Sequence, residues 1–123
     1  FIFPTTTPTQ FEPEAMHASI DRLLSFKPEA IYLTHYSRVG NVSQLGVDLH
    51  RRLDAMLACA LKVGGSGAER HEALTVALTD YLLAELRVHG CLLPQEKALE
   101  IWETDLELNA QGLEVWLDSR PST

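Results

Sequence analysis

The chain contains 123 residues, of which 46% are hydrophobic and 22% are charged, and its 17 acidic and 10 basic side chains give a net charge of −7. This composition is typical of a soluble globular protein with one modest core and excludes a disordered chain. Nucleic acid is excluded as a partner because phosphate binding needs clustered cations, and the densest basic pair, Arg51-Arg52, is flanked by Asp48 and Asp54. The longest uncharged apolar stretch, Ala55 to Leu61, is far shorter than the ~20 residues that span a bilayer, so we expect a cytoplasmic protein with no membrane segment.

The start of the chain predicts a strand, a helix and a second strand. A short apolar run at residues 1–3 ends at Pro4, which is typical of a strand followed by a loop. Pro13 suits the first turn of a helix, and apolar residues then recur at helical spacing, so we expect a helix over residues 13–26. The apolar residues 30–34 predict a buried second strand. Together these elements predict a βαβ unit with parallel strands joined by a right-handed crossover.

The rest of the chain is predicted to be helical. Apolar residues follow the helical period over residues 42–63, 67–89 and 94–117, with glycines or a proline at each break. Gly112 lies inside the last of these helices and is a weak point there, costing ~1 kcal/mol relative to alanine. Three helices with short connections predict an antiparallel bundle.

The predicted fold class is therefore mainly α, with a short βαβ remnant of two strands followed by a three-helix antiparallel bundle. We expect residues 1–40 to be the end of a larger sheet-containing domain and residues 41–123 to be a C-terminal helical domain. The chain opens on the apolar Phe1 without an initiator Met, so we also expect it to be a piece of a longer protein.

Three segments of the first 40 residues carry a resemblance to a known family. Phe1 to Pro13, Ser19 to Leu23, and Leu33-Thr34-His35-Tyr36 together resemble the closing segment of metallo-β-lactamase-fold hydrolases. In that superfamily a late strand ends in a histidine that binds one of two active-site metals, and the matching position is His35. The resemblance implies a parent enzyme in which a metal-bound hydroxide attacks an ester, thioester, lactam or phosphoester. The later helices match only the habit of many members of adding C-terminal helices.

The position of His35 supports this interpretation independently, because open α/β sheets bind their ligands just beyond the C-terminal ends of their strands. The alternative is a solvent-exposed histidine with no ligand. The family's main metal motif, His-x-His-x-Asp-His, is absent from this sequence. Because a zinc site takes three or four protein ligands, we expect two divalent metals, most simply zinc, in the full-length parent and none in this chain, which by itself is expected to be inactive.

Other residues have two interpretations each. Arg38 follows His35 closely, and its guanidinium could bind a carboxylate or phosphate of a small-molecule substrate, or it could be an ordinary surface residue. Cys59 and Cys91 could form one disulfide, but free thiols are the simpler interpretation. The remaining histidines are predicted to be solvated; they are His17, His50, His71 and His89.

The helical part suggests a second function. Three long apolar stripes predict a helical interaction or dimerisation module, a role that is compatible with membership of the hydrolase family. Uncovered strand edges and apolar helix faces favour a two-fold homodimer. The alternative is a compact monomer in which the helices fold over the βαβ unit.

Overall fold

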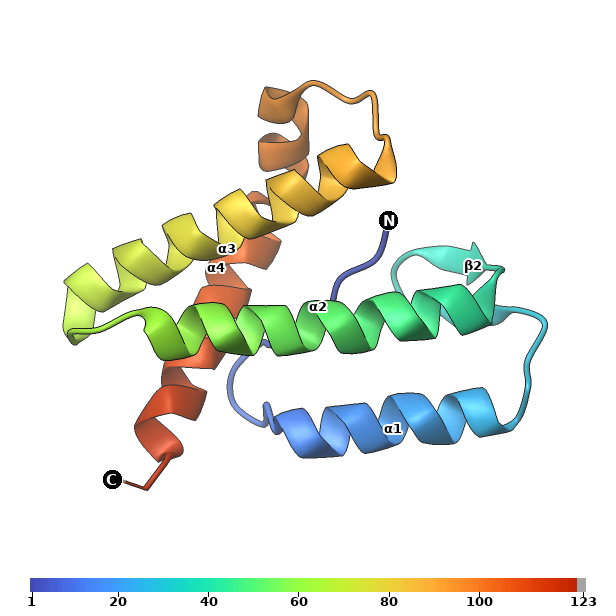
Figure 1. Cartoon of the computed structure of the whole chain (residues 1–123), viewed down its shortest axis with the longest axis horizontal. Coiled ribbons are helices and arrows are strands. Elements are labelled where there is room, and N and C mark those ends of the chain that lie inside the picture. Colours follow the sequence, from blue (N-terminus) through green and yellow to red (C-terminus); the bar gives the residue numbers. More distant parts are fainter. Residues whose placement is uncertain (122–123) are drawn as a thin grey trace. The chain divides into compact units, whose positions relative to one another are not determined.

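The computed structural model describes residues 1–121. Its elements, in chain order, are α1 (Pro13–Ser25), β1 (Ile31–Leu33), β2 (Ser37–Val39), α2 (Val42–Lys62), α3 (Gly67–His89) and α4 (Gln95–Ser119) (Figure 1). The predicted mainly helical fold class is confirmed, and the four helices lie where the apolar periodicity placed them. Among the described residues, no helix combines the length and the apolar character needed to cross a membrane.

The two strands are arranged differently from the prediction. β1 pairs with β2 in an antiparallel hairpin, with Tyr32 opposite Arg38, and residues 1–3 form no strand. The predicted parallel βαβ unit is therefore wrong. The physical reason is local: an antiparallel pair needs only a tight turn, whereas a parallel pair needs a crossover. Ser37 has a φ of +64°, a conformation that belongs to turns and lets the chain reverse directly after residues 34–36.

The chain divides into two compact units. One unit, which we call the helical unit, contains Phe1, Thr5–Phe11 and the chain from Ala55 onward. The other, which we call the hairpin unit, contains Ile2–Pro4 and Glu12–Asp54. The division thus falls within α2. The predicted domain boundary at residue 40 concerns the organisation of a parent protein and stays a prediction.

In the hairpin unit, α1 runs antiparallel to the first half of α2 (Figure 1). The two helices approach closely at Gly46, where a Cβ atom would lie 2.5 Å from Cδ1 of Leu24. Arg52 is buried and donates a hydrogen bond of 2.6 Å to the carbonyl oxygen of Ile2. Its guanidinium also lies 3.8 Å from the Asp48 carboxylate, so the buried charge has both an acceptor and an opposite charge nearby.

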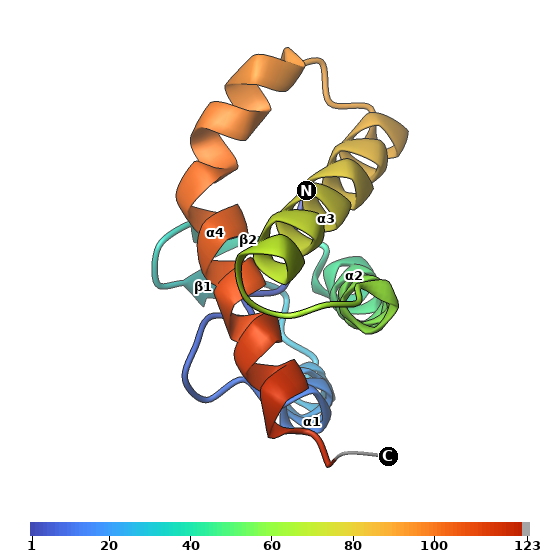
Figure 2. The same cartoon turned by 90° about the vertical axis from the view of Figure 1, so that its left-hand side faces the viewer.

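In the helical unit, α3 and α4 pack antiparallel across a leucine-rich core (Figure 2). The connection between them begins at Gly90, whose φ of +86° ends α3 in the left-handed conformation that glycine adopts without strain. Each fully buried leucine contributes roughly 1.5–3 kcal/mol through the hydrophobic effect. Buried core residues of the two helices include Leu74, Leu78, Leu82, Leu106, Ala110 and Leu113.

The N-terminal segment Thr5–Phe11 belongs to the helical unit and is fixed to α4. Thr6 is fully buried, and its backbone N–H donates to Oδ1 of Asn109 at 2.8 Å. The Thr6 hydroxyl donates to the backbone carbonyl of Asn109 at 2.9 Å. The absence of a side chain at Gly112 makes room for this segment, because a Cβ atom there would lie 1.4 Å from the Thr6 carbonyl oxygen. Residues 5–11, which were expected to form a loop, are thus packed and hydrogen-bonded within the helical unit.

Candidate functional site

His35 lies in the turn at the tip of the β1–β2 hairpin, and its side chain is exposed. Arg38 lies on β2 and is also exposed, so the structure places both predicted site residues on one short hairpin. Ile31 and Val39 are half-buried, whereas Tyr32 and Arg38 on the alternate positions face solvent. This alternation holds one face of the hairpin against the protein and leaves its tip accessible.

The hairpin does not provide a metal centre by itself. Within residues 1–121, no group of three or more His, Cys, Asp or Glu side chains is arranged to hold a metal ion. A catalytic zinc needs three protein ligands, and His35 supplies one imidazole. The residues of this chain therefore do not fit the two-metal centre that the family resemblance implies, and the remaining ligands would have to come from outside this sequence.

The structure brings together His17 and His50, which sequence analysis left apart and predicted to be solvated. Their Nδ1 atoms lie 2.5 Å from one another, with the ring centroids 4.8 Å apart and the ring planes inclined by 17°. On the far side, Nε2 of His17 lies 2.8 Å from Asp54, and Nε2 of His50 lies 2.8 Å from Asp21. The histidine side chains are 29% and 26% exposed. The two histidines, which we call the histidine pair, lie at the centre of a continuous Asp–His–His–Asp chain across α1 and α2.

A sequence signal for this cluster exists. His17 and Asp21 are four residues apart on α1, as are His50 and Asp54 on α2, so each helix presents an imidazole and a carboxylate on one face. Antiparallel packing then places each histidine beside the aspartate of the other helix. Knowing that α1 and α2 are neighbours is the step that the sequence alone did not provide.

His71 forms a second cluster, in the helical unit. A solvated side chain was expected there, but the His71 side chain is only 30% exposed and bonds to two carboxylates. Its Nδ1 lies 2.7 Å from Glu114 and its Nε2 lies 3.0 Å from Glu107. The neighbouring Arg70 donates two hydrogen bonds, of 2.8 and 3.0 Å, to the carboxylate of Asp118. Two basic residues near the start of α3 are therefore joined to three acidic residues of α4, which ties the ends of the two helices together.

These contacts change the protonation of the cluster. Hydrogen bonding to Glu114, and then to Glu107, raises the pKa of His71 above its ordinary value. The pKa of Glu107 is lowered, first by a hydrogen bond from Gln111 and then by His71. Because the imidazolium is held between two carboxylates, the cluster acts as an ion-pair network between helices.

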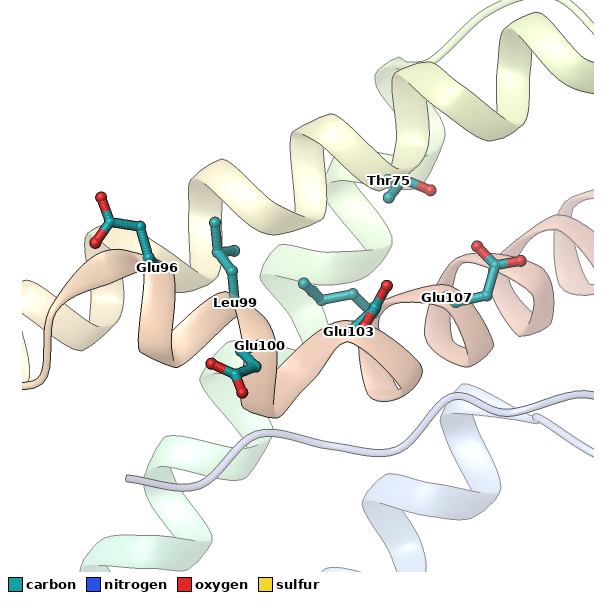
Figure 3. A pocket seen from close by; sticks show the side chains of 7 residues that line it. Thr75, Glu96, Leu99, Glu100, Glu103 and Glu107 are labelled. Carbon is teal, nitrogen blue, oxygen red and sulfur yellow. The ribbon is translucent and has the colours of Figure 1, made fainter.

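A shallow groove of about 610 Å³ lies between α3 and α4 (Figure 3). Acidic side chains of α4 dominate its wall, and Thr75 of α3 lies across from them. Labelled residues that line it are Glu96, Leu99, Glu100, Glu103, Glu107 and Thr75. These glutamates are exposed, and their carboxylates would repel an anionic substrate, so we assign no activity to this groove.

Both cysteines are free thiols, which confirms the simpler of the two interpretations. Cys59 is half-buried, and burial raises the pKa of its thiol, with Lys62 acting in the opposite direction. A raised pKa disfavours the thiolate, which is the reactive form, so Cys59 is not a candidate nucleophile. Cys91 is exposed in the connection between α3 and α4.

Comparison with known proteins finds no match to this chain among protein-family models, curated proteins or solved structures. The likeness to metallo-β-lactamase-fold hydrolases therefore depends on the residues that carry it, chiefly the run from Leu33 to Tyr36. The role proposed for His35 rests on that likeness, and the role proposed for Arg38 rests on its position three residues after His35.

Proposed function

We propose that the chain is the C-terminal segment of a metallo-β-lactamase-fold, metal-dependent hydrolase, and that His35 is one of the metal ligands of the parent protein. The observation that supports this proposal is the exposed position of His35 in the turn that joins β1 to β2. Among the described residues, its imidazole takes part in no hydrogen bond or ion pair, so both ring nitrogens are available. An accessible imidazole in a short turn between two paired strands is suited to serve as a metal ligand.

The proposed reaction class of the parent is hydrolysis of an ester, thioester, lactam or phosphoester. This chain contributes His35 as a ligand and Arg38 as a cation on the same hairpin that binds a carboxylate or phosphate of the substrate. It contributes no further catalytic residue, so the isolated chain is inactive. The α2–α4 region is then a helical extension that follows the hydrolase domain.

Hydrolysis by the parent protein tests the reaction class. Purified parent is assayed with one ester, one thioester, one lactam and one phosphoester, before and after removal of metal by a chelator. We expect hydrolysis of at least one substrate to disappear with the metal and to return when zinc or manganese is added back. Hydrolysis that is indifferent to the chelator, or no hydrolysis of any class, would contradict the proposal.

A second function is favoured by exposed apolar residues around the α3–α4 connection. Val88 and Leu92 are 87% and 97% exposed, and Ile101 on α4 is also largely exposed. Exposed apolar side chains that gather into one patch mark interaction sites, because large apolar patches are uncommon on a monomer. We therefore propose that this end of the helical unit is a dimerisation surface, occupied by a second copy of the chain.

A further inference from the structure

The contact between Nδ1 of His17 and Nδ1 of His50 needs a proton or a cation between the two nitrogens. Both Nε2 atoms face carboxylate oxygens, so each Nε2 carries the proton that the carboxylate accepts. When both rings are neutral, neither Nδ1 then carries a proton, and two lone pairs face each other across 2.5 Å. A positive species between the two nitrogens is needed to make this geometry favourable.

The carboxylates around the pair suit a divalent ion. Asp21 and Asp54 lie on the outer sides of the two rings, and their side chains are 72% and 70% exposed, so water screens their charges. A shared proton and a divalent cation would both bridge the two Nδ1 atoms, and the titration below distinguishes them. Imidazole nitrogen is a ligand for zinc, copper and nickel, and magnesium and calcium prefer oxygen.

We propose that His17 and His50 form a binding site for one divalent transition-metal ion, coordinated by both Nδ1 atoms. Metal-binding histidines characteristically donate their second N–H to a carboxylate, which fixes the tautomer and aims the lone pair at the metal. Asp54 and Asp21 occupy this position for His17 and His50, at 2.8 Å in each case. The site is separate from the proposed role of His35 and does not depend on it.

Metal binding requires only a small opening of the pair. Two nitrogens bound to one tetrahedral zinc at 2.0–2.1 Å are about 3.3 Å apart, so the rings must separate by about 0.8 Å. Both side chains are about a quarter exposed, which leaves room for this movement and for water molecules to complete the coordination. With two protein ligands instead of four, we expect a dissociation constant for zinc on the order of 10 µM.

Calorimetric titration of the full chain with zinc chloride at pH 7.5 tests the site. We expect one zinc per chain, and no binding of magnesium chloride under the same conditions. His17→Phe and His50→Phe keep an aromatic ring in the pair but remove a ligand, and each should weaken zinc binding at least 10-fold. Asp54→Asn keeps both imidazoles and should weaken binding ~10-fold, because it acts on the orientation of His17.

Controls separate this site from other histidines. His89→Gln and His71→Gln should bind zinc like the unmodified chain, and circular dichroism should show that every variant retains its helices. Nitrogen NMR should show the Nδ1 resonances of His17 and His50 moving when zinc is added. No zinc binding below 1 mM, or binding that persists in both phenylalanine variants, would contradict the proposal and leave a shared proton as the only occupant.

Discussion

The carbonyl oxygen of Thr6 lies beside Gly112, only 1.4 Å from where a Cβ atom on that residue would be. Hydrogen bonds to Asn109 hold Thr6 in this place, and all three residues belong to the helical unit. The glycine in the middle of α4 is therefore required for the N-terminal segment to dock. A side chain at this position has to push backbone away, which is costlier than moving the end of a flexible side chain.

Replacing Gly112 by alanine should therefore destabilise the protein. Helix propensity alone predicts the opposite, a gain of ~1 kcal/mol, but the clash with the Thr6 backbone outweighs it. We expect a net loss of about 1–3 kcal/mol in the free energy of unfolding, measured by urea denaturation. Gly64→Ala is the control, because a Cβ there has nothing within 4 Å, and it should change the free energy by less than about 0.5 kcal/mol. A more stable Gly112→Ala variant would show that Thr6 is not docked at this place.

The ion pairs of His71 should make stability depend on pH. Because the folded-state pKa of His71 is raised, the protonated imidazole stabilises the fold below the unfolded-state pKa of about 6.5. This contribution is lost as the pH rises through the folded-state pKa. We expect the free energy of unfolding to fall by less between pH 6 and pH 8.5 in His71→Gln than in the unmodified chain. Lys97→Gln, which removes an exposed ion pair with Glu100, should leave the pH dependence unchanged. Identical slopes for His71→Gln and the unmodified chain would contradict the assignment.

The proposed dimerisation surface predicts a change in mass. The unmodified chain should scatter light with twice its mass of 13.7 kDa at micromolar concentration. Leu92→Glu places a charge in the exposed apolar surface and should return the mass to that of the monomer. Val76→Glu alters an exposed apolar residue elsewhere on α3 and should leave the dimer intact. A monomer mass for the unmodified chain throughout a dilution series would rule out this surface as a dimer interface.

The helices could be predicted from the sequence because their signals are local. Pro13 begins α1, Gly90 ends α3, and apolar residues at helical spacing fill each span between such boundaries. The hairpin was missed because β2 contains a single apolar residue, Val39, and a three-residue strand gives almost no periodic signal. The short apolar run at residues 1–3 wrongly predicted a strand, because three residues are too few to show a periodic pattern.

Long-range contacts account for the other differences. The sequence alone predicts Gly112 to be a weak point because the segment that it contacts, which contains Thr6, is remote in the sequence: Thr6 and Asn109 are separated by 103 positions. The histidine pair joins residues 33 positions apart and becomes evident only when α1 and α2 are known to be neighbours. The positions of His35 and Arg38 on one exposed hairpin are compatible with the predicted site. The proposed hydrolase centre would need metal ligands in addition to His35.

Metal content of the full-length parent carrying His35→Ala is the most direct test of the proposed function. Removing one imidazole from the proposed centre should lower the bound metal per protein, measured by elemental analysis, and reduce kcat/KM at least 100-fold. His89→Ala is the matched control and should retain the metal and the rate, since His89 contacts the ring of Phe1 and is assigned no metal. Unchanged metal content and unchanged kcat/KM in His35→Ala would remove His35 from the site and contradict the proposed function.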